Sequence, residues 1–365
     1  MATTRGHLTN WTVVVPLLAV VALVLAWGRD LPTFAVVVVA AFLAGAVLAA
    51  VHHAEVVAAR VGEPFGSLVL AVAVTIIEVA LIVTLMISGG DKTSSLARDT
   101  VFAAVMITCN GIVGLCILVA ALRRRIAVFN PEGTGGALAT VATLATLSLA
   151  VPTFTTSESG ARFSPGQLAF AAVSSLALYG LFVAVQTVRH RDYFLPITSA
   201  GEVIDAEEHA DPPTSRTAAL SLGLLLVALI AVVGNAKAVS PAIESGVEAA
   251  GFPPSFVGVV IALLVLLPET LAAVRAARRD RLQTSLNLAY GSAMASIGLT
   301  VPAIAIAMIW LEGPLVLGLG ATQLVLLGLT MVVSILTVVP GRATPLQGGV
   351  HLSLMAAFIF LAISP

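Results

Sequence analysis

The sequence predicts an all-α polytopic membrane protein with about eleven transmembrane helices. Of the 365 residues, 59% are hydrophobic and only 10% are charged, which is more apolar surface than one soluble core can bury. The apolar residues gather in eleven long runs separated by glycine, proline and charged residues. The lysines and arginines favour alternate connections between these runs, as expected when successive helices cross a bilayer.

The first apolar run follows Met1–Asn10 and shows no small-residue cleavage site, so we interpret it as a retained first span. A bilayer core about 30 Å thick needs about 20 apolar residues per helix, because only a helix satisfies its own backbone in lipid. The predicted spans lie near residues 11–27, 33–51, 67–87, 101–121, 137–153, 166–188, 217–236, 255–274, 284–310, 314–338 and 348–363.

The distribution of basic residues predicts the orientation of the chain. With the N-terminus in the cytoplasm, thirteen of the 18 lysines and arginines fall in cytoplasmic segments, and the C-terminus lies outside. We therefore expect a multi-pass protein of the cell (plasma or inner) membrane, surrounded by lipid. The net charge of −1 and the lack of a clustered basic surface argue against a nucleic-acid partner.

The longest polar stretch, from Arg189 to Arg216, joins the sixth and seventh spans on the predicted cytoplasmic side. One interpretation is a solvated linker between two halves. The other is a regulatory or cation-gathering segment, because clustered carboxylates raise the local concentration of cations. Its possible regulatory residues are Glu202, Asp205, Glu207, Glu208 and Asp211.

Two glutamates stand inside apolar runs, and they are the main functional signal. Glu78 lies in the third span and Glu269 in the eighth. A carboxylate at membrane depth costs a few kcal/mol or more, so it normally faces a cavity, a partner or an ion path. The competing interpretation is a glutamate near a helix end whose carboxylate reaches the interface.

The placement of these glutamates predicts an inverted repeat. They are five spans apart, so their helices cross the membrane in opposite senses. Phe65 precedes Glu78 by the same interval as Phe256 precedes Glu269. A charged connection and a helix rich in small polar residues follow each glutamate; these residues are Thr108, Asn110, Gly111 and Gly114 in the first half and Asn287, Gly291, Ser292, Ser296 and Gly298 in the second. Inverted repeats with polar sites at mid-depth are typical of secondary transporters.

Pro268, directly before Glu269, removes a backbone donor and so frees a carbonyl upstream. Freed carbonyls and carboxylates are hard oxygen ligands that suit Ca²⁺, Na⁺ or K⁺ rather than zinc or copper. A packing kink is the alternative for Pro268. No cofactor is expected beyond the transported cation and the proton. Cys109 and Cys116, seven residues apart on one predicted helix, are too distant to form a disulfide.

Three stretches strengthen the signal of the two glutamates: residues 285–293 (SLNLAYGSA), 297–302 (IGLTVP) and 185–192 (VQTVRHRD). At these positions the chain resembles the calcium:cation antiporter superfamily, and within it the bacterial cation/proton antiporters of the ChaA type. The resemblance covers nearly the whole chain. It implies exchange of cytoplasmic Ca²⁺, Na⁺ or K⁺ for external protons, rather than an enzymatic activity.

The resemblance also implies ten helices in two inverted repeats of five, with one extra N-terminal helix. Residues 1–30 would form the extra helix, 31–188 the first repeat, 189–216 the acidic linker and 217–365 the second repeat. Glu78 and Glu269 would be the cation ligands, also serving as the metal site, with Asn110 and Ser292 beside them. Thr75, Ser296 and Pro268 complete the predicted cation/proton site.

The chain departs from relatives dedicated to calcium, which often carry Gly-Asn or Gly-Thr shortly before the glutamate. Here Val74-Thr75-Ile76-Ile77 and Val265-Leu266-Leu267-Pro268 stand in those places. Fewer side-chain oxygens weaken the case for strong Ca²⁺ coordination, and Na⁺ or K⁺ stays open. The mechanism we expect is competition, in which the glutamates hold either a cation or protons and only the neutralised site passes through the occluded state.

Two other functions are weighed against exchange. A cation channel or uniporter without proton coupling would need rings of acids or a carbonyl filter, and the sequence shows no such repeat. An intramembrane enzyme would need a nucleophile and base or a metal pair, and only the two glutamates approach that. His351, within the last span, is interpreted as a buried histidine whose nitrogens both have partners, and the alternative is a group that titrates near neutral pH.

Overall fold

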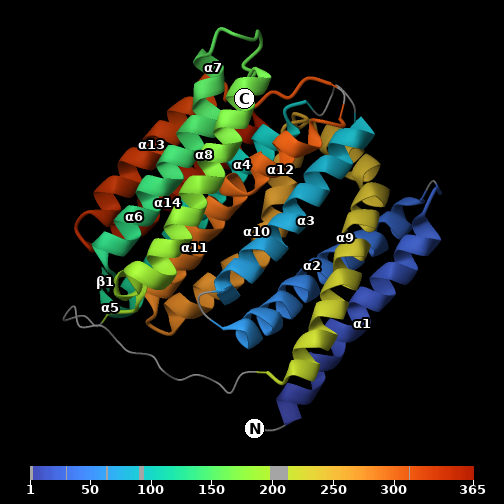
Figure 1. The fold of residues 1–365 in the computed structure, drawn as a ribbon, viewed down its shortest axis with the longest axis horizontal. Helices are drawn as coiled ribbons and strands as arrows, with labels where there is room; N and C mark the ends of the chain where they lie inside the picture. The colour runs from blue at the N-terminus through green and yellow to red at the C-terminus, as the bar shows by residue number, and fades with distance from the viewer. Residues whose placement is uncertain (1–2, 30, 63–64, 90–93, 198–212, 312) are drawn as a thin grey trace. The chain divides into compact units, whose positions relative to one another are not determined.

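The computed structural model describes residues 3–29, 31–62, 65–89, 94–197, 213–311 and 313–365 (Figure 1). This part of the chain is almost entirely helical. Nine of its helices are long and apolar enough to cross a membrane, and shorter apolar helices cover Trp11–Ala26 and Val72–Ile87. The prediction of an all-α polytopic protein with eleven apolar spans is therefore confirmed.

The helices follow the predicted spans in order. Three of them contain π-helical turns, at η2, η3 and η4, and η5 is a short 3₁₀ helix. The elements are α1 (Thr3–Ala26), α2 (Thr33–Val61), α3 (Phe65–Gly89), α4 (Leu96–Met106), η2 (Ile107–Ile112), α5 (Val113–Arg124), β1 (Ala127–Val128), α6 (Pro131–Ala145), η3 (Thr146–Ala150), α7 (Val151–Phe154), α8 (Pro165–Ala184), η4 (Val185–Arg189), η5 (Arg191–Phe194), α9 (Ser215–Ala249), α10 (Phe256–Arg278), α11 (Leu282–Gly298), α12 (Thr300–Ala307), α13 (Ala321–Val338), β2 (Arg342–Ala343) and α14 (Pro345–Ile363).

The chain forms two compact units. Unit 1 contains residues 1–93 and 209–257, and unit 2 contains residues 94–208 and 258–365. Each unit takes helices from both sides of the linker, so the units cut across the predicted repeats. The repeat boundaries at 31–188 and 217–365 therefore stay a prediction.

In unit 1, α2 and α9 pack along each other, and α1 and α3 each pack on both of them (Figure 1). Buried polar side chains add to this apolar packing. Asn235 Nδ2 of α9 donates to the carbonyl of Ala19 at 2.8 Å, and His53 Nε2 of α2 lies 3.0 Å from the carbonyl of Thr12. These bonds use the backbone of α1, so α1 is an integral part of unit 1.

In unit 2, α11 packs against α4, η2 and α5, and also against α6 and α8. A short antiparallel pair, β1 with β2, joins the ends of α5 and α13. Gly298 lets α11 approach α8 closely, because a Cβ at this position would lie 2.8 Å from Tyr179 Cβ. The core of unit 2 is therefore built around α11.

Four predicted spans differ from the observed helices, and the first of them, at 33–51, continues to Val61. The span at 217–236 continues to Ala249, because the helix accommodates Pro241 and Ser240 Oγ bonds to Glu244 at 3.0 Å one turn later. The span at 284–310 ends at Ala307 and breaks at Leu299, between α11 and α12.

The span predicted at 314–338 begins only at Ala321, because the apolar residues before it are extended rather than helical. The amides of Val316, Gly318 and Leu319 donate to the carbonyls of Ser94, Ala161 and Leu149 at 2.9–3.0 Å. A Cβ at Gly318 would lie 2.8 Å from the backbone nitrogen of Thr153. Backbone carbonyls of other segments accept these hydrogen bonds, and hydropathy alone does not distinguish such an extended segment from a helix.

Candidate functional site

Glu78 lies near the middle of α3, far from both Phe65 and Gly89 at the helix ends. Its side chain is buried, with 2% exposure, and Thr75 one turn earlier on the same face is also buried. Val72 and Ile76 are exposed on another side of the helix. The position is therefore mid-helix and enclosed, and the carboxylate does not sit at a helix end as the competing interpretation would require.

Glu269 occupies the corresponding position of α10, because it follows Phe256 by the same interval as Glu78 follows Phe65. The residue is half-buried, and its Oε2 atom is fully buried. The helix runs through Pro268 without interruption. A hydrogen bond within the same helix spans this position: Thr270 Oγ1 donates to the carbonyl of Leu266 at 2.7 Å.

Two contacts within unit 2 fix the helix that carries Glu269. Near its start, Gly258 approaches the backbone of α4, since a Cβ there would lie 2.8 Å from the amide nitrogen of Thr100. One turn after Glu269, Ser285 Oγ of α11 donates to the carbonyl of Ala273 at 2.7 Å. Glu269 therefore projects from a helix anchored on both sides. Glu78 belongs to unit 1 and Glu269 to unit 2, so the proximity of the carboxylates stays a prediction.

Asn110 lies in the π-helical turn η2 and is fully buried. Its Nδ2 donates to Thr330 Oγ1 of α13 at 2.9 Å, and its Oδ1 lies 3.1 Å from His351 Nδ1 of α14. His351 Nε2 in turn lies 3.1 Å from Thr337 Oγ1. With Asn110 Nδ2 as donor, a neutral histidine completes the chain by donating from Nδ1 and accepting at Nε2.

We call this set the Asn110 network: Asn110, Thr330, Thr337 and His351. It confirms the prediction that both His351 nitrogens have partners. Sequence reasoning missed the two threonines, although Thr330, Ser334 and Thr337 follow helical spacing and are all buried on one face of α13. A π-helical turn frequently marks a functional site, and this one places the buried amide of Asn110.

The serines predicted for the second half lie on α11. Ser296 is buried and Ser292 is half-buried. Since α11 packs on α4, η2 and α5, the structure brings together the two helices that follow the glutamates along the chain. Asn287, nearer the start of α11, donates to the carbonyl of Phe194 at 2.7 Å and accepts from Gln283 Nε2 at 2.9 Å.

The possible regulatory carboxylates, Glu202, Asp205, Glu207, Glu208 and Asp211, lie outside the described residues. The segment that leads to them is fixed at η5, where Phe194 contacts Phe182 edge to face. Within the part of the chain that the structure describes, no group of three or more histidine, cysteine, aspartate or glutamate side chains could hold a metal ion. Cys109 and Cys116 are free thiols and buried, as predicted.

Comparison with known proteins agrees with this architecture. The chain is 46% identical over 367 residues to the candidate ionic transporter y4hA of Sinorhizobium fredii, covering 99% of this chain and 98% of the relative. It is 33% identical over 353 residues to the sodium-potassium/proton antiporter ChaA of Escherichia coli, covering 95% and 94% of the two chains. The solved H⁺/Ca²⁺ exchanger CAX has the same fold, with a TM-score of 0.72 at 15% identity over 98% of this chain and 89% of that one.

The family model described as sodium/calcium exchanger protein matches residues 31–188 and 220–364. These ranges include α3 and α10, which carry the two glutamates, and the helices α4, η2, α5 and α11 that follow them. The resemblance to the calcium:cation antiporter superfamily is thereby confirmed, and the relatives are transporters rather than enzymes. The chain belongs to the sodium/calcium exchanger protein family and is a multi-pass membrane protein of that family.

Proposed function

We propose that this chain exchanges a cytoplasmic cation, Na⁺, K⁺ or Ca²⁺, for external protons, with Glu78 and Glu269 as the shared cation and proton site. The observation that carries the proposal is the burial of Glu78 at the centre of an apolar helix, with Glu269 at the equivalent position of a second helix. A mid-helix carboxylate in a membrane span is costly and is retained where it serves transport. The names of the relatives ChaA and CAX support proton-coupled exchange.

The mechanism is competition for the carboxylates. Burial away from water disfavours a charged carboxylate, so the empty site holds protons. A cation supplies the opposite charge and displaces them. Only a neutralised site crosses the occluded state, and this coupling needs no cofactor beyond the transported cation and the proton. Thr75, Ser292 and Ser296 supply further oxygen atoms for the cation. Asn110 stabilises the π-helical turn η2, in the helix that follows α3.

The residues before each glutamate favour Na⁺ or K⁺ over Ca²⁺. Ca²⁺ takes six to eight oxygen ligands, whereas the four residues before Glu78 and before Glu269 offer one hydroxyl, that of Thr75. The 33% identical relative is named a sodium-potassium/proton antiporter. We also propose a cytoplasmic N-terminus and an external C-terminus in the inner membrane, from the bias of lysine and arginine.

The test uses everted vesicles loaded with a pH-sensitive dye, with each cation added in turn over a range of pH. We expect Na⁺ or K⁺ to dissipate the proton gradient in vesicles that contain the wild-type chain. Glu78→Gln and Glu269→Gln should each reduce this signal to that of vesicles without the protein, because an amide neither releases a proton nor neutralises a cation. Glu132→Gln, an exposed glutamate in the first turn of α6, is the matched control and should exchange normally.

Full exchange in either site variant would overturn the assignment of that glutamate. Cation flux that dissipates a membrane potential but moves no protons against the cation would instead identify a channel or uniporter. A signal with Ca²⁺ but with neither monovalent ion would overturn the proposed ion preference and leave the exchange mechanism intact.

A further inference from the structure

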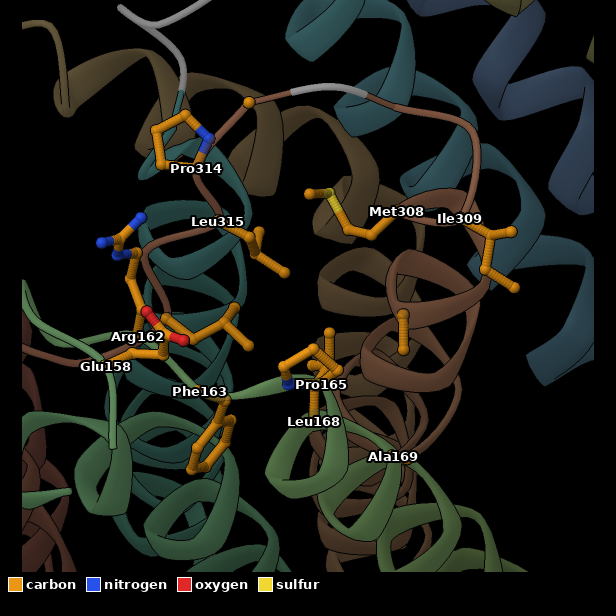
Figure 2. Close-up of a pocket in the computed structure, with 13 residues that line it drawn as sticks. Glu158, Arg162, Phe163, Pro165, Leu168, Ala169, Met308, Ile309, Pro314 and Leu315 are labelled. Atoms are coloured by element: carbon orange, nitrogen blue, oxygen red, sulfur yellow. The ribbon is translucent and has the colours of Figure 1, made fainter. Parts of the chain in front are cut away.

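Unit 2 contains a pocket of about 550 Å³ where α8 begins and α12 ends (Figure 2). Its wall is mostly apolar, and it carries one acidic and one basic side chain, Glu158 and Arg162. Figure 2 shows these two on one side of the pocket and Met308 and Ile309 on the other. A pocket of this size accommodates a small amphipathic ligand.

The pocket lies beside the ends of two apolar spans, where lipid headgroups are expected. Two apolar spans, Pro165–Arg189 and Leu282–Ala307, respectively start and end beside it. Trp310 follows directly and is 74% exposed, as expected of a tryptophan at the membrane interface. Further along α8, toward the middle of the span, the apolar side chains of Phe170 and Val173 are exposed. The occupant therefore has to match both an interface and lipid.

The pocket is preformed by hydrogen bonds in its rim. The amide of Gly318 donates to the carbonyl of Ala161 at 3.0 Å, which joins the two loops that border the pocket. Gln167 Oε1 accepts from the amide of Ser164 at 2.9 Å and from Ser157 Oγ at 2.7 Å. Preformed walls reduce the conformational entropy that a ligand must overcome on binding.

The two charges of the rim are available to a ligand. Arg162 Nε donates to the carbonyl of Ser159 at 2.7 Å and Nη2 lies 3.5 Å from Ser159 Oγ, which orients the guanidinium and leaves its outer N–H groups for a ligand. Glu158 is exposed, and among the described residues neither Glu158 nor Arg162 takes part in an ion pair. Opposite charges that border one pocket without neutralising each other complement a zwitterion.

We propose that this pocket binds a phospholipid with an ethanolamine headgroup. The phosphate accepts hydrogen bonds from Arg162, the primary ammonium donates to Glu158, and one acyl chain lies along Leu168 and Ile309 toward Phe170. An anionic headgroup without an amine would leave Glu158 beside a second negative charge. A choline headgroup carries no N–H to donate to the carboxylate. The inference is independent of the cation site.

The test is native mass spectrometry of the purified full chain after incorporation into bilayers of equimolar phosphatidylethanolamine, phosphatidylcholine and phosphatidylglycerol. We expect the wild-type chain to retain phosphatidylethanolamine in excess of the other two. Arg162→Gln should lower retention of all three lipids, by roughly three- to tenfold, the effect expected for one charge-assisted hydrogen bond at a half-exposed site. Glu158→Gln should abolish the preference for ethanolamine while phosphatidylglycerol retention holds or rises.

Glu132→Gln and Arg342→Gln are the matched controls, because both residues are exposed and lie near the β1–β2 end of unit 2, across the span of α6 from the pocket. Leu168→Trp tests the pocket separately, because the larger side chain fills the pocket while Glu158 and Arg162 are unchanged. This variant should also lower lipid retention. Equal retention of the three lipids by the wild-type chain, or equal losses in the pocket and control variants, would overturn the proposal. Size-exclusion chromatography checks that each variant is folded.

Discussion

The two helices that follow the glutamates look alike in sequence but hold their polar residues differently. In the first, Asn110 is fully buried in a π-helical turn and bonded to Thr330 and His351, on two other helices. In the second, Asn287 is half-buried near the start of α11, and it bonds to Gln283 and to the backbone of Phe194. Small polar residues on the two helices that follow the glutamates therefore stabilise different parts of those helices.

The difference assigns the two helices unequal roles. The Asn110 network ties η2 to α13 and α14, so it fixes the first helix at mid-span. The bonds of Asn287 fix the start of the second helix, ahead of Ser292 and Ser296 along α11. We infer that the first helix is the more rigid of the two where the predicted cation site lies.

Replacing Asn110 by leucine should give the largest loss of stability. Asn110→Leu leaves the Nδ1–H of His351 and the hydroxyl of Thr330 buried without their partner, at a cost of about 2–4 kcal/mol. Asn287→Leu should cost less, about 1 kcal/mol, because its partner Gln283 keeps a second bond from Nε2 to Thr134 Oγ1. Thermal unfolding of the two variants in the same detergent measures the difference.

His351→Asn is the control for that comparison, because it removes the partner and keeps Asn110. It should destabilise less than Asn110→Leu, since Asn110 then retains its bond to Thr330. If Asn110→Leu and Asn287→Leu unfold at the same temperature, the two helices are equally constrained and the first is not the more rigid one.

Two adjacent glycines of α14 test how tightly the first helix is clamped. A Cβ at Gly348 would lie 2.8 Å from the amide nitrogen of Leu118 and 3.0 Å from the carbonyl of Gly114, whereas a Cβ at Gly349 would meet nothing within 4 Å. Alanine favours a helix over glycine by about 1 kcal/mol. Gly349→Ala should therefore raise the unfolding temperature slightly, and Gly348→Ala should lower it, by about 1–3 kcal/mol of overpacking. Shifts of the same sign would show that α5 and α14 can separate without cost.

The eleven spans were predictable because lipid and protein both favour long apolar runs, and helices alone satisfy their backbone there. The same reasoning placed a helix at 314–320, where the chain is apolar but extended. Its amides bond to the carbonyls of Ser94 and Ala161 in loops and of Leu149 in η3, all of which lie in the first half of the chain. Local hydropathy carries no information about such partners.

The candidate site shows the same limit. Glu78, Glu269 and Asn110 were visible because each is a polar residue in an apolar run. Asn110 bonds to Thr330 and His351, which lie near the C-terminal end of the sequence. Without knowledge of helix packing, no sequence pattern connects Asn110 with these two residues. The spacing of Thr330, Ser334 and Thr337 on α13 predicts a polar helix face, but it does not predict that Asn110 is a partner of that face. Burial can be predicted from sequence more easily than pairing.

The smallest predicted effect concerns the ion pair that joins the two compared helices at one end. Arg124, the last residue of α5, binds Asp280, just before α11, at 2.8 Å, and the two side chains are 65% and 36% exposed. The hydrogen bond from Arg124 lowers the pKa of Asp280 below its ordinary value of 3.8. The stability that this pair contributes is therefore present at neutral pH and is lost as the pH falls below 3.8 toward the lowered pKa.

Asp280→Asn should lower the unfolding temperature slightly at neutral pH, and the difference from wild type should shrink in acid and in high salt. Thermal unfolding of both chains across a pH series measures this difference. Glu132→Gln, an exposed substitution outside this pair, should show no such dependence. A difference that grows as the pH falls would contradict the pairing, because it would require Asp280 to act in its protonated form.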